Sequence, residues 1–496
     1  MAESAAGATP VFPGDRVERH DPRYPTMVRG FNRRFVGHPR YVQVCGDTGQ
    51  VVRTVQRAVD EGLRLTVRCG GHCYEDFVCD NDGGVIVDMS AMDGVHRDGP
   101  DGDYCVEGGA TLWNVYTHLY REYGVTLPAG SCYSVGVGGH VTGGGYGLLS
   151  RLHGLTVDFL HAVEVVRVDD AGRAEAITVS RDSPDPDERE LLWAHLGGGG
   201  GNFGVVTRFW FREPPPAPTE AWLLNHAWSW SDLDPDSFAG LVQRYGEFHA
   251  ANSGVGSPFA GLFGALHLTQ NAGASSQVGL TAQYVGDEPS LLDEFAVAMR
   301  GDLPAPQVQA TPVGHHRAGL RDTEIQRMPW LFATQTLNGS GPNQRGKYKS
   351  AYMIEPFPEA QVEAMWEHLA EPLNPNPQAL LQVDSYGCQV NAVAPDATAV
   401  PQRSSIMKLQ YQTYWTDPAD DAQNLDWIRG FYDAMYGGRG PYPDGTVDGC
   451  YVNYPDVDLD DWQYLYYKNG YPRLRGAKER SDPLDVFRHQ QSIEPA

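Results

Sequence analysis

Three glycine-rich stretches in the first half of the chain constrain its fold more than any other feature. They are RCGGHC at 68–73, PAGSCYSVGVGGHVTGGGYG at 128–147 and GGGGGNFGVVT at 197–207. Glycine lets the backbone approach a ligand closely and present consecutive N–H groups to a pyrophosphate. Flexible turns are the alternative interpretation, but three such stretches in one half of the chain favour a ligand cradle.

The third stretch contains the spacing GxGxxG, formed by Gly199, Gly201 and Gly204. A Rossmann site requires a strand before this motif and a helix after it. Here the motif is followed by VVTRFWF, which is typical of a strand, and then by prolines. The chain also lacks the GK[ST] of a nucleotide-phosphate loop. We therefore expect a dinucleotide-binding fold of a non-Rossmann type.

The first 212 residues mix helical and strand patterns. Apolar residues recur at helical spacing over 47–62, with Asp47 and Gln50 as a possible cap and Gly62 as the stop. The runs LRLTVRC and VIVDMS predict strands. The run TLWNVYTHLYREYG predicts a second helix that ends at Gly124. This part of the chain is therefore predicted to be an α+β domain.

A domain boundary is predicted at 213–220, where EPPPAPTE holds four prolines that can continue neither a helix nor a central strand. Residues 213–425 alternate aromatic strand-like runs (LLNHAWSW, VGLTAQYV, AYMIEPF, KLQYQTYW) with helical ones (SFAGLVQRYGEFHA, EAQVEAMWEHLA). Residues 426–496 are too few to fold alone, so we expect them to pack on the first region. The sequence thus predicts two domains. One is formed by residues 1–212 together with 426–496, and the other by residues 213–425.

Charge and cysteine content exclude several classes of partner. The chain has 496 residues and a formal net charge of −25, which repels phosphate backbones and anionic lipid, so we expect neither nucleic acid nor a membrane as partner. The first residues have neither the basic start nor the apolar run of a secretory signal, and no segment reaches about 18 continuous apolar residues, so we expect neither a signal nor a membrane span. The 8 cysteines are too sparse for a disulfide framework, which favours free thiols and a cytoplasmic location. The sequence leaves the oligomeric state open.

Five ordered motifs carry a family resemblance. They are R-C-G-G-H at 68–72, G-S-C-Y-S-V-G-V-G-G-H at 130–140, G-N-F-G-V-V at 201–206, K-S at 349–350 and Y-V-N-Y-P-D-V-D-L at 451–459. The set resembles the berberine-bridge-enzyme-like branch of the vanillyl-alcohol-oxidase flavoprotein superfamily, near its bacterial antibiotic-pathway oxidases. This implies a two-domain α+β protein with a PCMH-type FAD-binding fold. Its FAD-binding domain would comprise 1–212 and 426–496, and an antiparallel-sheet substrate domain covered by helices would comprise 213–425.

The resemblance implies that FAD is bound covalently twice, through His72 at the 8α-methyl group and through the sulfur of Cys132 at C6 of the isoalloxazine. Considered alone, His72 could be an ordinary loop histidine and Cys132 a small buried hydrophobe. Cys69 departs from the serine that is usual in the family. The further residues assigned to FAD are Arg68, Cys69, Gly70, Gly71, Cys73, Val137, Gly138, Gly139, Gly143, Gly144, Tyr146, Asp158, Gly200, Asn202, Phe203, Gly204, Val206, Tyr451 and Asn453.

Tyrosines are the catalytic candidates that the resemblance suggests. Tyr454 is our choice of base, and Tyr451 is interpreted as structural or flavin-contacting, although one sequence leaves the choice between them open. A free phenol has a pKa of about 10, so a nearby positive charge or donor must favour the phenolate. Lys408, with Gln410 beside it, is the candidate. Tyr146 and Tyr386 are expected over the flavin ring.

The resemblance implies oxidation of a hydroxyl on a bulky natural product, glycosylated or polyketide-type, with O2 reduced to H2O2. Oxidative ring closure or C–C bond formation is a second hypothesis, and a flavin-binding protein without oxidase turnover is a third. No metal is expected, because His140 and His153 lack the ligand spacing of a metal site. A serine hydrolase is excluded because the chain has no GxSxG motif.

Overall fold

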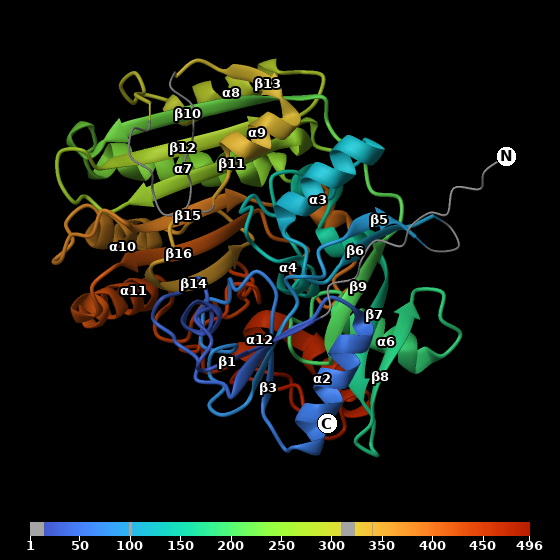
Figure 1. The fold of residues 1–496 in the computed structure, drawn as a ribbon. Helices are drawn as coiled ribbons and strands as arrows, with labels where there is room; N and C mark the ends of the chain where they lie inside the picture. Colours follow the sequence, from blue (N-terminus) through green and yellow to red (C-terminus); the bar gives the residue numbers. More distant parts are fainter. Residues whose placement is uncertain (1–13, 99–101, 309–322, 340) are drawn as a thin grey trace.

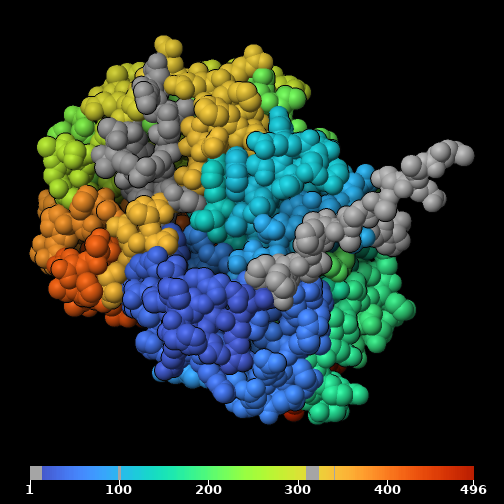
Figure 2. Space-filling model, viewed as in Figure 1, coloured from blue at the N-terminus to red at the C-terminus, as the bar shows by residue number. Residues whose placement is uncertain are grey.

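The computed structural model describes residues 14–98, 102–308, 323–339 and 341–496. Three sheets with their helices form two bodies, one built on a seven-stranded sheet and the other on two smaller sheets (Figure 1). In Figure 2 the blue N-terminal residues abut gold and orange residues of the sheet domain on the same face. Asn32 joins the two bodies, since its Nδ2 donates to the Gly346 carbonyl at 2.9 Å.

The smallest sheet has four strands in the order β1-β2-β4-β3, of which β2, β4 and β3 are parallel. Helix α2 packs between this sheet and the five-stranded sheet. It begins where predicted, because the Asp47 carboxylate accepts the Gln50 N–H at 2.8 Å. Gly62 follows the helix with φ +62°. The elements here are β1 (Asp15–Glu18), α1 (Tyr24–Met27), β2 (Tyr41–Val44), α2 (Thr48–Asp60), β3 (Leu65–Arg68) and β4 (Val85–Asp88).

The five-stranded sheet is antiparallel, in the order β5-β6-β9-β7-β8. The predicted strand VVTRFWF is β9, and the predicted second helix is α3, which continues as a wider π-helical turn and stops at Gly124 with φ +68°. Elements of this part are β5 (Val95–Arg97), β6 (Tyr104–Glu107), α3 (Leu112–His118), α4 (Val137–Thr142), α5 (Ser150–His153), β7 (Leu160–Val168), β8 (Ala174–Ser180), α6 (Pro186–His195), β9 (Val205–Phe211), α12 (Trp462–Tyr467) and α13 (Tyr471–Ser481).

The seven-stranded sheet is antiparallel throughout, in the order β13-β10-β12-β11-β15-β16-β14. All four strand-like aromatic runs lie in it, and both helical runs form helices, α7 and α10, as predicted. Its elements are β10 (Glu220–Ser229), α7 (Pro235–Asn252), β11 (Leu262–Thr269), β12 (Gln277–Tyr284), α8 (Ser290–Arg300), β13 (Gln326–Pro329), α9 (Trp330–Thr336), β14 (Arg345–Met353), α10 (Glu359–Leu369), β15 (Ala379–Ser385), β16 (Met407–Trp415) and α11 (Asp421–Tyr436).

The packing of α11 bears on the second domain boundary. The helix packs against α10, β14 and β16, all of which belong to the seven-stranded body. The division at 425/426 stays a proposal, and this packing favours a position after Tyr436. Helix α13, in contrast, packs on α6 of the other body, as expected for a C-terminal segment that returns to the first domain. Within the described ranges, no helix combines the length and apolarity needed to cross a bilayer.

Candidate active site

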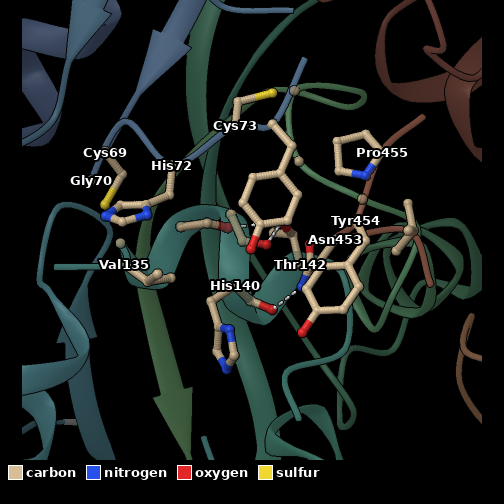
Figure 3. Close-up of a pocket in the computed structure, with 18 of the residues that line it drawn as sticks. Cys69, Gly70, His72, Cys73, Val135, His140, Thr142, Asn453, Tyr454 and Pro455 are labelled. Atoms are coloured by element: carbon tan, nitrogen blue, oxygen red, sulfur yellow. Dashed lines mark hydrogen bonds between the residues drawn. The ribbon is translucent and has the colours of Figure 1, made fainter. Parts of the chain in front are cut away.

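A cavity of about 350 Å³ lies between the two bodies. Its size is within the range of small-molecule and cofactor sites. All three glycine-rich stretches line it, together with residues from β15, β16, the segment 451–455 and the C-terminal tail. Figure 3 shows His72 and Tyr454 on opposite sides of this pocket.

The first two glycine-rich loops are packed backbone to backbone. A Cβ at Gly70 would overlap the backbone of Ser134 and Gly136, so glycine is required for this approach. His72 Nε2 consequently lies 2.9 Å from Ser134 Oγ, and its ring stacks on Phe31 at 4.4 Å. The hydrogen bond engages Nε2 and not Nδ1. His72 and the loop that carries Cys132 therefore belong to one wall.

Burial keeps both predicted attachment residues uncharged. It lowers the pKa of His72 to about 4, so the imidazole is neutral at pH 7. It raises the pKa of Cys132 to about 12, with Asp384 adding to the rise and Lys408 offsetting part of it. A neutral imidazole is a nucleophile, whereas the cysteine must first lose its proton to become one.

The cavity fits a flavin dinucleotide. Gly139 lines it, and a Cβ added there would meet no protein atom within 4 Å, so a side chain would enter the space that the ligand needs. On the other side of the same turn, a Cβ at Gly138 would lie 3.0 Å from the Gly108 carbonyl oxygen, so the turn is closely packed from behind. The chemistry of His72 and Cys132 suits bonds to an electron-poor ring.

Tyr454 is held by a charged pair from the seven-stranded sheet. Lys408 Nζ donates to the Tyr454 hydroxyl at 3.0 Å and lies 4.5 Å from its ring centroid. The same ammonium pairs with Asp384 at 2.8 Å. Burial raises the pKa of Tyr454 well above its usual value, and Asp384 raises it further. The predicted lysine contact is therefore present, but its charge is balanced, and the phenol is protonated at neutral pH.

The other candidate tyrosines lie at different depths. Tyr146 lines the cavity and donates its hydroxyl to the Ser385 carbonyl. Tyr451 also lines it and accepts a hydrogen bond from Asn453 Nδ2 at 3.0 Å. Tyr386 is fully buried behind Tyr146, at 5.2 Å between ring centroids, and donates to a backbone carbonyl. Tyr386 does not line the cavity and its hydroxyl is turned toward the Gln402 carbonyl, so its expected position over the flavin ring stays a prediction that this placement disfavours.

Two family models match this chain, one for an FAD binding domain over residues 39–173 and one for berberine and berberine-like proteins over 450–494. Aclacinomycin-N/aclacinomycin-A oxidase of Streptomyces galilaeus is 42% identical over 97% of this chain and 90% of its own length. Hexose oxidase of Chondrus crispus is 38% identical over 96% and 94%. The solved glycopeptide hexose oxidase, in complex with teicoplanin, has a TM-score of 0.90 and 36% identity, over 98% of this chain and 100% of that one.

The chain belongs to the berberine-bridge-enzyme-like family of FAD-linked oxidoreductases. Its α+β, PCMH-type FAD-binding fold with an antiparallel substrate sheet is the one that the sequence motifs predict. FAD is its cofactor, and it is an oxidase that uses O2.

Most residues that the sequence assigned to this family's flavin site lie on the cavity wall. Those on the wall are His72, Cys132, Arg68, Cys69, Gly70, Gly71, Cys73, Gly138, Gly139, Tyr146, Gly200, Asn202, Gly204, Val206, Tyr451 and Asn453, with Tyr454 and Gln410 among the catalytic candidates. Those not on it are Val137, Gly143, Gly144, Asp158, Phe203, Tyr386 and Lys408. Asp158 instead pairs with Arg403 at 2.7 Å, and Phe203 is a core residue with 1% exposure.

Sequence reasoning missed several cavity residues of this oxidoreductase. Asp384 and Gln382 project from β15, and Gln412 from β16, onto the cavity wall. The available signal was the alternation of polar residues in LLQVDS and KLQYQ, which marks one polar face of a strand. Tyr74 was also missed; it stacks on a tyrosine of β14 and accepts a hydrogen bond from Gln410 at 3.1 Å.

Proposed function

We propose that the protein oxidises a hydroxyl group of a bulky natural product, glycosylated or polyketide-type, to a carbonyl. The observation that carries this proposal is the group Tyr454–Lys408–Asp384, which borders the same cavity as His72 and Cys132. An alcohol oxidation needs a base at the hydroxyl and a hydride acceptor at the carbon. Relatives that are named for action on aclacinomycins and on hexoses support this choice of substrate class.

In this mechanism the phenolate form of Tyr454, a small fraction at neutral pH, receives the hydroxyl proton of the substrate. Lys408 donates to the phenol oxygen and stabilises the phenolate form, while Asp384 holds the ammonium in place. A bound flavin would supply the hydride acceptor and the site where O2 is reduced to H2O2. Gln410 and Tyr146, both on the wall, would orient the substrate at this point.

The covalent attachment of FAD through both His72 and Cys132 is part of the proposal. Neutral His72 needs no activation, but the pKa of Cys132 at about 12 makes its thiolate scarce at pH 7. We therefore expect attachment at His72 to be complete first and attachment at Cys132 to proceed faster as the pH rises. Two bonds would hold the cofactor without closure over the ring, so the cavity could admit a wide substrate.

A cytoplasmic location is proposed on the cysteines. All 8 are free thiols, and burial raises the pKa of each one. Structural disulfides are rare in reducing compartments. The proposed partners are the small-molecule substrate and O2.

A substrate screen tests the proposed function. The purified holoenzyme is incubated with glycosylated and polyketide alcohols, and H2O2 release is measured. We expect peroxide in a 1:1 ratio to a product whose NMR spectrum contains a new carbonyl. Peroxide with a new ring or C–C bond would instead support oxidative cyclisation. Flavin reoxidation in air over minutes, without peroxide, would contradict an oxidase.

A further inference from the structure

Five charged residues form a cluster at the junction of the two bodies. Lys347 and Lys349, both from β14, have side chains that are 1% and 4% exposed. Lys347 Nζ donates to the Glu75 carboxylate and, at 2.7 Å, to Asp456 Oδ1. Lys349 Nζ donates to the other oxygen, Asp456 Oδ2, at 2.7 Å. Asp458 Oδ2 lies 3.3 Å from Lys347 Nζ and 3.1 Å from Lys349 Nζ. We call these residues the junction cluster.

The junction cluster connects the two segments that carry the proposed reacting groups. Glu75 lies three residues after His72, in the loop that follows β3. Asp456 lies two residues after Tyr454, which is on the opposite side of the pocket from His72 in Figure 3. Lys347 contacts both carboxylates from β14, the edge strand of the seven-stranded sheet. The histidine loop, the tyrosine segment and the sheet therefore meet at one ammonium group.

Tyr454 lies between two attachments of its segment to β14. Before it, the Tyr451 N–H donates to Ser350 Oγ at 3.0 Å. After it, the Asp456 carboxylate accepts hydrogen bonds from both lysines of the junction cluster. The sequence motifs K-S and YVNYPDVDL thus contact each other in the structure, and this contact gives a physical reason for the lysine of the first motif and the first aspartate of the second.

Stability alone does not explain this arrangement. A buried ion cluster stabilises a fold no more than apolar side chains of similar volume would, and often less. Charge-assisted hydrogen bonds are, however, short and directional, so they restrict the relative position of the groups that they join. Here two such bonds end on the two oxygens of Asp456, which fixes both the distance and the orientation of this carboxylate. The junction cluster is therefore suited to hold segments in place.

We propose that Lys347 is a positioning residue, which holds the His72 loop and the Tyr454 segment at a fixed separation across the cavity. Its catalytic consequence rests on the proposed function. In that function His72 places the hydride acceptor and Tyr454 takes the proton, so both must reach the substrate at once. A misplacement of about 1 Å in such a geometry lowers the rate by about 100-fold. Lys347 does not line the cavity, so it acts only through the segments that it joins.

The test variant is Lys347→Met combined with Glu75→Gln. It removes one charge of each sign, and the remaining charges stay balanced because Arg429 pairs with Asp458 at 2.8 Å. Lys347→Met alone would leave buried carboxylates without a partner, which destabilises a fold. Lys347→Arg is a second variant, which keeps the charge but changes the length and shape of the side chain. It should change the measurements below in the same direction, and it decides the test if the double variant does not fold.

The matched control is Arg345→Met combined with Asp421→Asn. Arg345 lies on the same strand, two residues before Lys347, and its ion pair with Asp421 joins β14 to α11. The control therefore also loses a balanced ion pair from β14. It leaves the bonds of Lys347 to the His72 loop and to the Tyr454 segment as they are in wild type.

Two measurements on the holoenzyme test the proposal. Hydrogen–deuterium exchange in peptides that cover 68–75 and 451–459 should be faster by about tenfold in the double variant, because these segments open more easily, and unchanged in the control. Flavin reduction by the alcohol found in the substrate screen, followed anaerobically by stopped flow, should be slower by about 10- to 100-fold. Reoxidation of the reduced flavin by O2 should keep its wild-type rate, because that step does not need the substrate hydroxyl at Tyr454.

Unchanged exchange in either segment would overturn the inference and leave the proposed function intact. Faster exchange with a normal rate of flavin reduction would also overturn it, because the junction cluster would then be purely structural. Equal losses in reduction and reoxidation would indicate general damage to the site and would likewise contradict a positioning role. If no alcohol reduces the wild-type flavin, the proposed function fails, and the exchange rates alone decide whether Lys347 holds the two segments.

Discussion

Removing the positive charge of Lys408 and removing the negative charge of Asp384 should shift the pH dependence of turnover in opposite directions. Lys408→Met removes a donor 3.0 Å from the phenol oxygen, and a hydrogen bond to a charged group is worth about 1.5–3 kcal/mol. At 1.36 kcal/mol per pKa unit, the pKa of Tyr454 should rise by a further one to two units. Because the phenolate is the active form, kcat/KM at pH 7 should fall by about 10- to 100-fold.

Asp384→Asn should have the opposite effect. The Asp384 carboxylate raises the pKa of Tyr454, and its removal leaves the Lys408 charge unbalanced beside the phenol. The rising limb of the pH profile should therefore move to lower pH, with higher relative activity under acidic conditions. The double variant should lie between the two single variants.

Peroxide release is measured from pH 5 to pH 10 for the four proteins, with flavin absorbance and melting temperature as checks on folding and cofactor content. If the rising limbs of the pH–activity profiles coincide for wild type and Lys408→Met, the reasoning is refuted. A shift of Asp384→Asn in the same direction as Lys408→Met would refute it as well.

Three further predictions concern single sites. Tyr454→Phe should retain covalently bound yellow flavin and lose about 100- to 10,000-fold in kcat, and full activity by peroxide assay would remove Tyr454 as the base. Gly139→Val should fold, but its absorbance spectrum should show little flavin, because the valine side chain enters the cavity. The control is Gly430→Val, where an added Cβ also meets open space but on the exposed side of α11; this variant should keep a normal flavin content. Asp47→Ala should lower the free energy of unfolding by about 1 kcal/mol in urea titration through loss of the α2 cap; an unchanged midpoint would contradict that role.

Local signals were sufficient to predict the elements that depend on neighbouring residues. The cap at Asp47 and the stop at Gly62 fix α2 through hydrogen bonds and backbone geometry within a few residues. The prolines after β9 mark the end of a strand for the same kind of reason. These features need no knowledge of the distant chain.

The site was predicted less completely because its contacts join distant segments. Lys408 and Tyr454 were paired correctly, but the ion pair with Asp384 depends on the register of β15 and β16, which no local pattern provides. That ion pair changes the expected chemistry of the base. Tyr386 was placed over the ring from its motif, yet the chain turns its hydroxyl toward Gln402. Cross-strand register and side-chain direction are therefore the missing information.

Peptide mapping of the denatured, protease-digested holoenzyme tests the central claim most directly. If both loops hold one flavin, mass spectrometry will find a single flavin-containing species that links the peptide with His72 to the peptide with Cys132. Release of all yellow pigment on acid precipitation, or two unmodified peptides, would contradict the account.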